Sequence, residues 1–243
     1  PRRGGGGAPL GGPPAAGRAA AARAGRAARL RGGRDAGRGG AGDEGFLRGG
    51  ECPMGAAVGG VRPGGAMKQV GLNVAAAPLM TSTSVGGDGG LVIITGDDPG
   101  MHSSQNEQDN RYYAKFGEIP MFEPSDAQEA KDMTIHAFKI SEKYDTPVFV
   151  RLTPRIGHTE CTVELGPRVD VPLRQYSRDC KKDALVPVHA FARHVDLEKR
   201  VAMLEAVSNT CDENRMEMRG LECGVITSGI SYQNVREALP DAS

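Results

Sequence analysis

Between residues 91 and 152 of this 243-residue chain, apolar residues occur in two patterns: short continuous runs and a helical periodicity of three and four residues. Leu91–Thr95 is a short apolar run, and Val148–Leu152 is interrupted only by Arg151, so both are typical of strands buried on both faces. After Ser125, apolar side chains recur at three- and four-residue steps, and Gln128 completes a capping-box pattern with Ser125. This predicts a helix that begins at Ser125 and buries one stripe, made of Ala127, Ala130, Met133, Ala137, Ile140 and Tyr144.

Three further elements are predicted around these. Small side chains favour a helix over Met67–Met80, although Gly71 and Pro78 weaken it. A second helix is predicted over Asn106–Phe116 and a short strand over Ile119–Phe122. Strands and helices that alternate at this spacing form βαβ units, so we expect an α/β fold with a parallel sheet covered by helices.

The C-terminal third has a different pattern. Residues 166–190 have mixed charge and little periodicity, which predicts a linker. A helix over Asp196–Val207, a strand over Cys223–Thr227 and a helix that ends near Leu239 are expected beyond it. We interpret residues 191–243 as the start of a second α/β domain that the chain does not complete.

Residues 1–66 differ in composition from the rest of the chain. They hold 22 of the 35 glycines and 11 arginines against four acidic residues. Such a segment buries too little apolar surface to offset its ordering entropy, so we expect a disordered tail. The net charge of zero therefore combines a basic tail with an acidic body, and it indicates little about partners.

Three interpretations of this tail compete. Arg31–Arg34 and Arg38–Gly40 resemble RGG-type segments that bind RNA electrostatically, although only Phe46 is available for stacking. A transit peptide would be rich in serine, and this tail has none. The interpretation we favour is a frame error or misplaced start in GC-rich DNA, because Gly, Ala, Pro and Arg are the residues of GC-rich codons.

The spacing of the cysteines and the hydropathy of the chain indicate the cellular compartment in which the protein is expected. The five cysteines (Cys52, Cys161, Cys180, Cys211 and Cys223) contain no C-x-x-C pair, which argues against a zinc site, an iron–sulfur cluster or a disulfide framework in this chain. No run of 18 apolar residues exists. We therefore expect a soluble, cytoplasmic protein without membrane contact.

The most informative segment is the polar loop that follows Leu91–Thr95. In open parallel sheets, ligands bind beyond the carboxyl ends of the strands, so a loop there is a candidate site. It contains the Asp97-Asp98 pair, which we interpret as ordinary loop residues rather than a metal site. His102 lies beside Ser103, Ser104, Gln105 and Asn106, where an imidazole could orient a substrate carboxylate or move a proton. A purely structural hydrogen-bond network is an equal alternative.

The glycine-rich segment Gly86–Gly90 invites comparison with the G-D-G signature that binds magnesium diphosphate in thiamine enzymes. That signature follows a strand, whereas this segment precedes the strand Leu91–Thr95. We therefore interpret it as a turn.

The sequences of several segments resemble those of a known family, the thiamine-diphosphate-dependent 2-oxoacid:ferredoxin oxidoreductases. Within that family they resemble the α subunits that act on indolepyruvate. The resemblance covers about residues 67–243 and is weaker between 166 and 215. It is carried by Lys68–Asn73, Asp97–Arg111, Glu123–Glu129, Asp145–Val148, Arg151–Arg155 and Val225–Gln233.

This resemblance implies a pyrimidine-binding-like domain over residues 67–165 and a transketolase-C-terminal-like domain from residue 191. It implies cofactor contacts for Lys68, Gln69, Asn73, His102, Ser103, Ser104, Gln105 and Asn106. The family's ring-activating glutamate has no convincing match here, because the residues around Glu44 and Glu51 do not match the family's motif. Ala77 also replaces an acidic residue that the family would have at this position.

The resemblance also implies the chemistry of the intact enzyme. It would convert aryl 2-oxoacids such as indolepyruvate to aryl-acetyl-CoA with thiamine diphosphate, Mg²⁺ and [4Fe-4S] clusters. Its partners would be a β subunit, ferredoxin and coenzyme A. We expect the present chain to be a fragment that by itself binds no cofactor tightly and is inactive. The alternative is a non-catalytic α/β protein with a basic RNA-binding tail.

Overall fold

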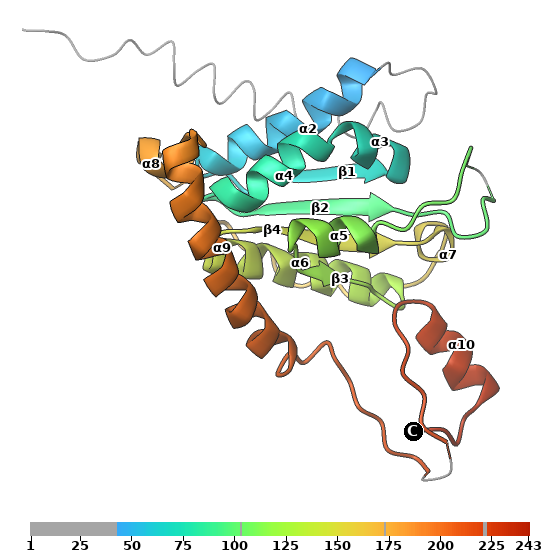
Figure 1. Cartoon of the computed structure of the whole chain (residues 1–243). Coiled ribbons are helices and arrows are strands. Elements are labelled where there is room, and N and C mark those ends of the chain that lie inside the picture. The colour runs from blue at the N-terminus through green and yellow to red at the C-terminus, as the bar shows by residue number, and fades with distance from the viewer. Residues whose placement is uncertain (1–42, 103, 173, 221–222) are drawn as a thin grey trace, which may run out of the picture. The chain divides into compact units, whose positions relative to one another are not determined.

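The structure is a computed structural model that describes residues 43–102, 104–172, 174–220 and 223–243 (Figure 1). These residues all belong to one compact unit, Gly39–Ser243. The first 42 residues lie outside the described part, as do the RGG-like segments Arg31–Arg34 and Arg38–Gly40.

A four-stranded parallel sheet forms the centre of this unit. Its strands are β1 (Gly64–Lys68), β2 (Leu91–Gly96), β4 (Pro147–Leu152) and β3 (Met121–Phe122), in that order across the sheet. The register pairs Thr95 of β2 with both Met67 of β1 and Arg151 of β4. The predicted parallel α/β fold is therefore confirmed.

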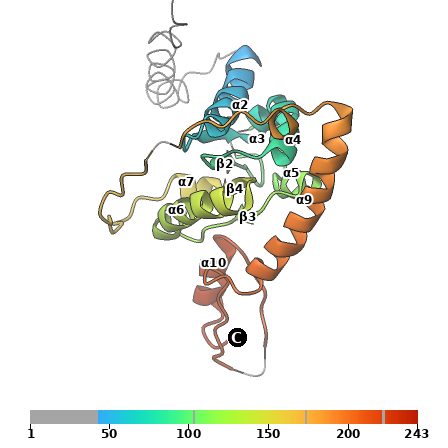
Figure 2. The same ribbon diagram turned by 90° about the vertical axis from the view of Figure 1, so that its left-hand side faces the viewer.

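Helices cover both faces of the sheet (Figure 2). On one face Leu91, Ile93 and Phe149 pack against α2 (Asp43–Val58), α3 (Gln69–Val74), α4 (Ala76–Val85) and α5 (Arg111–Gly117). On the other face Val92, Val148 and Val150 pack against α6 (Ala127–Tyr144). Neighbouring residues of one strand thus enter opposite cores, which explains why β2 and β4 are apolar at nearly every position.

The apolar stripe predicted on α6 is the face of that helix that packs against the sheet. Met133, Ala137 and Ile140 are buried against β2 and β4. The predicted start is wrong by one residue, because Asp126 is the N-cap and its carboxylate accepts the Glu129 N–H at 2.8 Å. The Glu129 carboxylate accepts from the backbone and hydroxyl of Ser125, the residue before the N-cap, so only the Asp126-to-Glu129 half of a capping box forms.

Part of the segment that the sequence predicts as a disordered tail is ordered. Residues 43–66, which we assigned to it, form α2 and lead into β1, and Ala57 of α2 is fully buried. The helix predicted over Met67–Met80 begins only at Gln69 and is divided at Ala75 into α3 and α4. The reason is that Gly64–Lys68 pairs along its whole length with β2, and these backbone hydrogen bonds override a composition unfavourable to strands.

The C-terminal part differs from the expected second domain. Within residues 166–190 the structure has α8 (Cys180–Asp183) and the first turn of α9 (Pro187–Ser208), so the linker is only partly irregular. The strand predicted over Cys223–Thr227 does not form. Its backbone bonds instead to Ser243, through Val225 N–H at 2.7 Å and Cys223 O at 3.0 Å. The last helix, α10 (Ser231–Ala238), agrees with the prediction.

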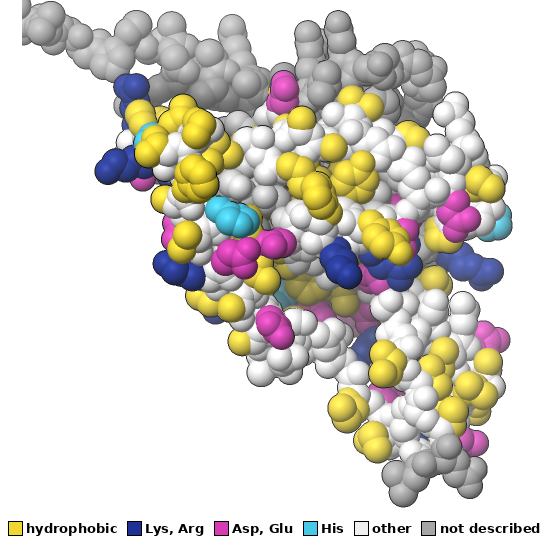
Figure 3. Space-filling view, viewed as in Figure 1, with side chains coloured by type: hydrophobic (Ala, Val, Ile, Leu, Met, Phe, Trp, Pro, Cys, Tyr) yellow, Lys and Arg dark blue, Asp and Glu magenta, His cyan; other side chains and the backbone are white. Residues whose placement is uncertain are grey.

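The outer surface of α5 and α9 carries apolar side chains among charged ones (Figure 3). Phe116 of α5 is 78% exposed and Phe191 of α9 is 79% exposed. No helix in the described ranges is both long enough and apolar enough to cross a membrane.

Candidate functional site at the carboxyl edge of the sheet

The four strands are parallel, so the segments that follow them meet at one edge of the sheet. Gln69 follows β1, the polar loop 97–110 follows β2, Glu123 follows β3, and Arg151 is the penultimate residue of β4. A short helix, α7 (Pro154–Gly157), follows β4. This edge is the place where a ligand of an open parallel sheet is expected.

A buried ion pair joins β2 and β4 at this edge. Arg151 Nε donates to Asp97 Oδ2 at 2.5 Å, and the same oxygen accepts the Asn110 N–H at 2.9 Å. Arg151 Nη1 donates to Glu123 Oε1 at 2.6 Å, which brings in the segment after β3. Both carboxylates thus share one guanidinium, and the ends of three neighbouring strands are held together.

A second cluster fixes the polar loop onto α3. The buried Asp98 carboxylate accepts from Ser104 Oγ at 2.8 Å and from the His102 backbone N–H at 3.2 Å. Gln69 Nε2 donates to Ser104 Oγ at 2.8 Å, and Lys68 Nζ lies 3.8 Å from Asp98 Oδ2. The loop is therefore anchored from the first residues after β1.

The predicted site residues fall into three groups. Lys68, Gln69 and Ser104 come together around Asp98, and Asn106 joins them through its backbone oxygen, 3.4 Å from Gln69 Nε2. Asn73 lies apart from this cluster and accepts from the Tyr113 hydroxyl at 2.7 Å. His102 and Gln105 have exposed side chains, and Ser103 lies outside the described residues.

The same edge contains buried polar atoms that lack a hydrogen-bond partner within the described part of the chain. They include Gln69 Oε1, Asp97 Oδ1, and both side-chain atoms of Asn110, Oδ1 and Nδ2. Buried polar groups are almost always hydrogen-bonded, so such a group in a protein needs an explanation, for example a water or a ligand. These atoms occupy one edge of the sheet and are amide and carboxylate groups, so a polar ligand fits this edge better than an apolar one.

The sequence analysis missed Arg151, Glu123 and Asn110 as site residues. One signal was available for Arg151, since a charge inside an otherwise apolar strand requires a partner. Glu123 and Asn110 lie in segments that carry the family resemblance, but only the strand order places Glu123 beside Arg151, and only the folded loop places Asn110 beside Asp97.

Asp97 and Asp98 hold the polar loop in place through these contacts. The Gly86–Gly90 segment is a turn between α4 and β2, at the opposite end of β2 from the polar loop. Gly86 and Gly90 have φ of 73° and 75°, and the Gly89 N–H donates to Ala57 O at 2.9 Å.

Comparison with known proteins gives consistent results. Residues 92–219 match the family model described as pyruvate flavodoxin/ferredoxin oxidoreductase, thiamine diphosphate-binding. The chain is 40% identical over 191 residues to indolepyruvate oxidoreductase subunit IorA of Archaeoglobus fulgidus, which covers 78% of this chain and 31% of the relative. The corresponding subunit of Thermococcus kodakarensis is 41% identical over 197 residues, which is 78% of this chain and 30% of that subunit.

A solved structure has the same fold. The 2-oxoglutarate:ferredoxin oxidoreductase of Magnetococcus marinus superposes with a TM-score of 0.55 at 16% identity, over 80% of this chain and 42% of that one. The present chain spans about a third of the length of the curated relatives named above.

Proposed function

This chain belongs to the pyruvate flavodoxin/ferredoxin oxidoreductase family, and we propose that its sheet edge forms the pyrimidine-facing wall of a thiamine diphosphate site. Lys68, Gln69, Asn73 and the loop from His102 to Asn106, which includes Ser103, Ser104 and Gln105, supply this wall. The bound cofactor provides the electron sink for decarboxylation of a 2-oxoacid. The single observation that carries the proposal is the match of residues 92–219 to a thiamine-diphosphate-binding family.

The side chains at the edge suit the aminopyrimidine ring. That ring presents an amino group that donates and ring nitrogens that accept. Gln69 Oε1 is an acceptor without a partner in the described residues, and the Asn110 amide offers one donor and one acceptor. Both side chains are fully buried in the structure, so the ring would reach them only after the polar loop 97–110 moves aside.

The edge does not supply the carboxylate that activates the ring in this family. Asp97 and Glu123 share Arg151, and Asp98 holds Ser104 and the His102 backbone. Glu44 and Glu51 both belong to α2, the helix that packs against β1 and α3. The proposed role of the described edge is therefore to bind and orient the ring, and proton transfer at the ring is left to another group.

The intact enzyme, in this proposal, converts indolepyruvate and related aryl 2-oxoacids to the aryl-acetyl-CoA and carbon dioxide. In the intact enzyme, Mg²⁺ would help to hold the cofactor diphosphate, and [4Fe-4S] clusters would supply the redox chemistry that reduces ferredoxin. A β subunit and coenzyme A complete the set of partners. The exposed apolar side chains of α5 and α9, such as Phe116 and Phe191, are consistent with a multi-subunit enzyme, because exposed apolar groups favour protein contacts.

Cofactor binding by the intact oxidoreductase tests the proposal. Gln69→Leu is expected to weaken thiamine diphosphate by about tenfold or more, because one buried hydrogen bond contributes roughly 0.5–1.5 kcal/mol and its loss strands Ser104 as well. Gln128→Leu is a matched change on α6, at an amide that donates to Asp132 and accepts the Glu164 N–H, and it should leave cofactor affinity unchanged. Equal affinities for both variants would refute the assignment of this edge.

A further inference from the structure

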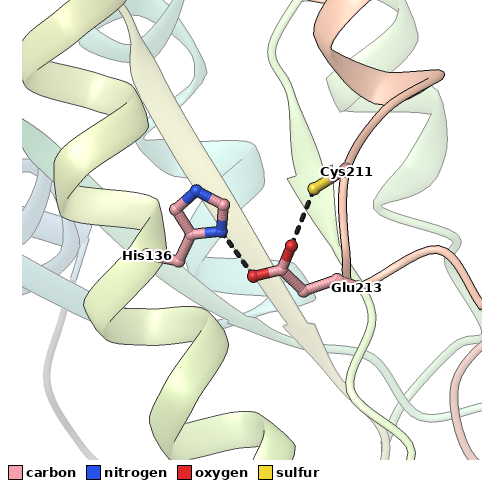
Figure 4. Close-up of side chains that lie close together, drawn as sticks. All are labelled: His136, Cys211 and Glu213. Atoms are coloured by element: carbon pink, nitrogen blue, oxygen red, sulfur yellow. Dashed lines mark hydrogen bonds and ion pairs between the residues drawn. The ribbon is translucent and has the colours of Figure 1, made fainter.

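A separate cluster of metal-binding side chains lies between α6 and the segment that follows α9 (Figure 4). His136 projects from α6, and Cys211 and Glu213 come from the turn after α9. Cys211 Sγ donates to Glu213 Oε2 at 2.7 Å, and His136 Nδ1 contacts the other oxygen of the same carboxylate. One nitrogen, one sulfur and one oxygen atom from the three residues lie within 4.8 Å of one another.

We propose that His136, Cys211 and Glu213 form a zinc site, with water as the fourth ligand. Zinc is the divalent ion that accepts imidazole nitrogen, thiolate sulfur and carboxylate oxygen together, at about 2.0–2.3 Å from each. Ligand atoms around such an ion are roughly 3.3–3.8 Å apart in a tetrahedron. Small rotations of three side chains therefore suffice to enclose an ion. Calcium and magnesium prefer oxygen ligands alone and do not suit this set.

The surroundings of the cluster support a fixed geometry. The His136 ring packs against Phe122, with ring centroids 5.6 Å apart. All three ligand residues are half-buried, and the side chains of His136 and Glu213 are 31% and 23% exposed. This exposure leaves access for an ion and a coordinated water, whereas the Phe122 ring limits how far the imidazole can turn.

Charge balance also favours a divalent ion. A neutral imidazole, a thiolate and a carboxylate together carry two negative charges, which one Zn²⁺ neutralises. Without metal, Cys211 Sγ donates to Glu213 Oε2, so the cluster holds a protonated thiol. Metal binding therefore releases the thiol proton to solvent, because only the thiolate is a good ligand.

The bound ion would link two parts of the chain that are far apart in sequence, since His136 and Glu213 are separated by 77 positions. His136 belongs to the α6 layer, and Cys211 and Glu213 begin the segment that leads to α10. A second contact, between Arg215 and Glu129 of α6, ties the same segment to the same helix. The bound ion would thus fasten the C-terminal segment onto the core, and the proposal does not depend on the proposed cofactor function.

Cobalt spectroscopy tests the proposal directly. The 243-residue chain, stripped with a chelator and titrated with Co²⁺ under reducing conditions, should bind one ion with a thiolate-to-cobalt charge-transfer band. One equivalent of Zn²⁺ should displace it. Cys211→Ser should abolish the band, and His136→Gln should weaken Zn²⁺ by more than about 100-fold, since even outer-shell partners contribute about 10–100-fold.

Two exposed residues give matched controls. Cys161→Ser and His158→Gln change the same residue types outside the cluster and should leave the band and the affinity unchanged. Circular dichroism checks that each variant is folded, and Glu213→Gln serves as a second ligand variant if Cys211→Ser does not fold. Absence of the band in the unmodified chain, or a band that persists in Cys211→Ser and disappears in Cys161→Ser, would overturn the proposal.

Discussion

Arg151 and Asp97 form a buried ion pair across two neighbouring parallel strands, with Nε 2.5 Å from Oδ2. Arg151 is the penultimate residue of β4, and Asp97 is the first residue after β2. The backbone supports the same junction, since the Asp97 N–H donates to Leu152 O at 2.9 Å. The polar loop that follows Asp97 thus starts from a fixed position, and this fixed start allows Ser104 and Asn106 to meet Gln69.

Removal of the Arg151 guanidinium should therefore lower the free energy of unfolding. Arg151→Met leaves the carboxylates of Asp97 and Glu123 close together without the guanidinium that they share, although Arg111 Nε remains 4.0 Å from Glu123. Loss of one partner of a buried pair typically costs about 3–5 kcal/mol. Urea unfolding of the 243-residue chain measures this. Arg168→Met removes an exposed arginine that pairs with the exposed Asp170, and it should change stability by less than about 0.5 kcal/mol. Similar unfolding midpoints for the two variants would contradict the role assigned to Arg151.

The turn before β2 offers a steric test. A Cβ on Gly89 would lie 1.9 Å from Val61 O, which is a backbone atom that cannot move aside cheaply. Gly89→Ala should destabilise the chain by at least about 1–3 kcal/mol, the usual cost of overpacking. At Gly157 an added Cβ meets nothing within 4 Å, so Gly157→Ala should be neutral or slightly stabilising. Thermal unfolding followed by circular dichroism distinguishes the two, and a stable Gly89→Ala variant would show that the turn is not packed as described.

The N-cap of α6 gives a third prediction. Asp126→Ala removes the side-chain acceptor for the Glu129 N–H and should cost about 0.5–2 kcal/mol. Asp132→Ala, on the exposed surface of the same helix, should cost less than about 0.5 kcal/mol. Chemical denaturation of both variants provides the comparison. If Asp132→Ala were the more damaging change, the cap would not be at Asp126.

The sequence predicted those elements whose pattern is strong and local. The segments that form β2 and β4 and the stripe on α6 are apolar because each contacts a hydrophobic core. This pattern can be recognised in the sequence without knowing which elements pack against it. Strand β1 could not be predicted in this way. Its sequence contains two glycines and a lysine, and it is a strand only because β2 offers a backbone to pair with.

The site was predicted in part for the same reason. The polar loop after β2 was recognisable because a strand end is a defined place in a parallel sheet. The partners of that loop were not recognisable, since Arg151 and Glu123 are brought together by the order β2-β4-β3. His136 and Cys211 are a stronger example. Isolated cysteines without a C-x-x-C spacing argue against a metal site, yet the fold places Cys211, in the turn after α9, beside His136 of α6.

The last prediction concerns acid. Glu142 of α6 binds Arg62, with one contact at 2.7 Å, and also Arg174 at 3.2 Å. The hydrogen bonds from Arg62 hold the pKa of the Glu142 carboxyl below its ordinary value of 4.5. A depressed pKa in the folded state means that the ionised form is favoured by folding. This contribution to stability is therefore complete above about pH 4.5 and is lost as the pH falls through the lower pKa of the folded state.

Glu142→Gln should accordingly destabilise the chain at pH 7 and lose that effect in acid. The Glu142 side chain is 11% exposed but Arg62 is 33% exposed, so solvent and salt should screen the pair and reduce the difference at high ionic strength. The measurement is the difference in unfolding free energy between the unmodified chain and the Glu142→Gln variant, from pH 7 down to the lowest pH at which both fold. Glu160→Gln makes the same change at an exposed position and should have little effect at pH 7. A Glu142→Gln difference that grew as the pH fell would have the wrong sign for a carboxylate stabilised by arginine.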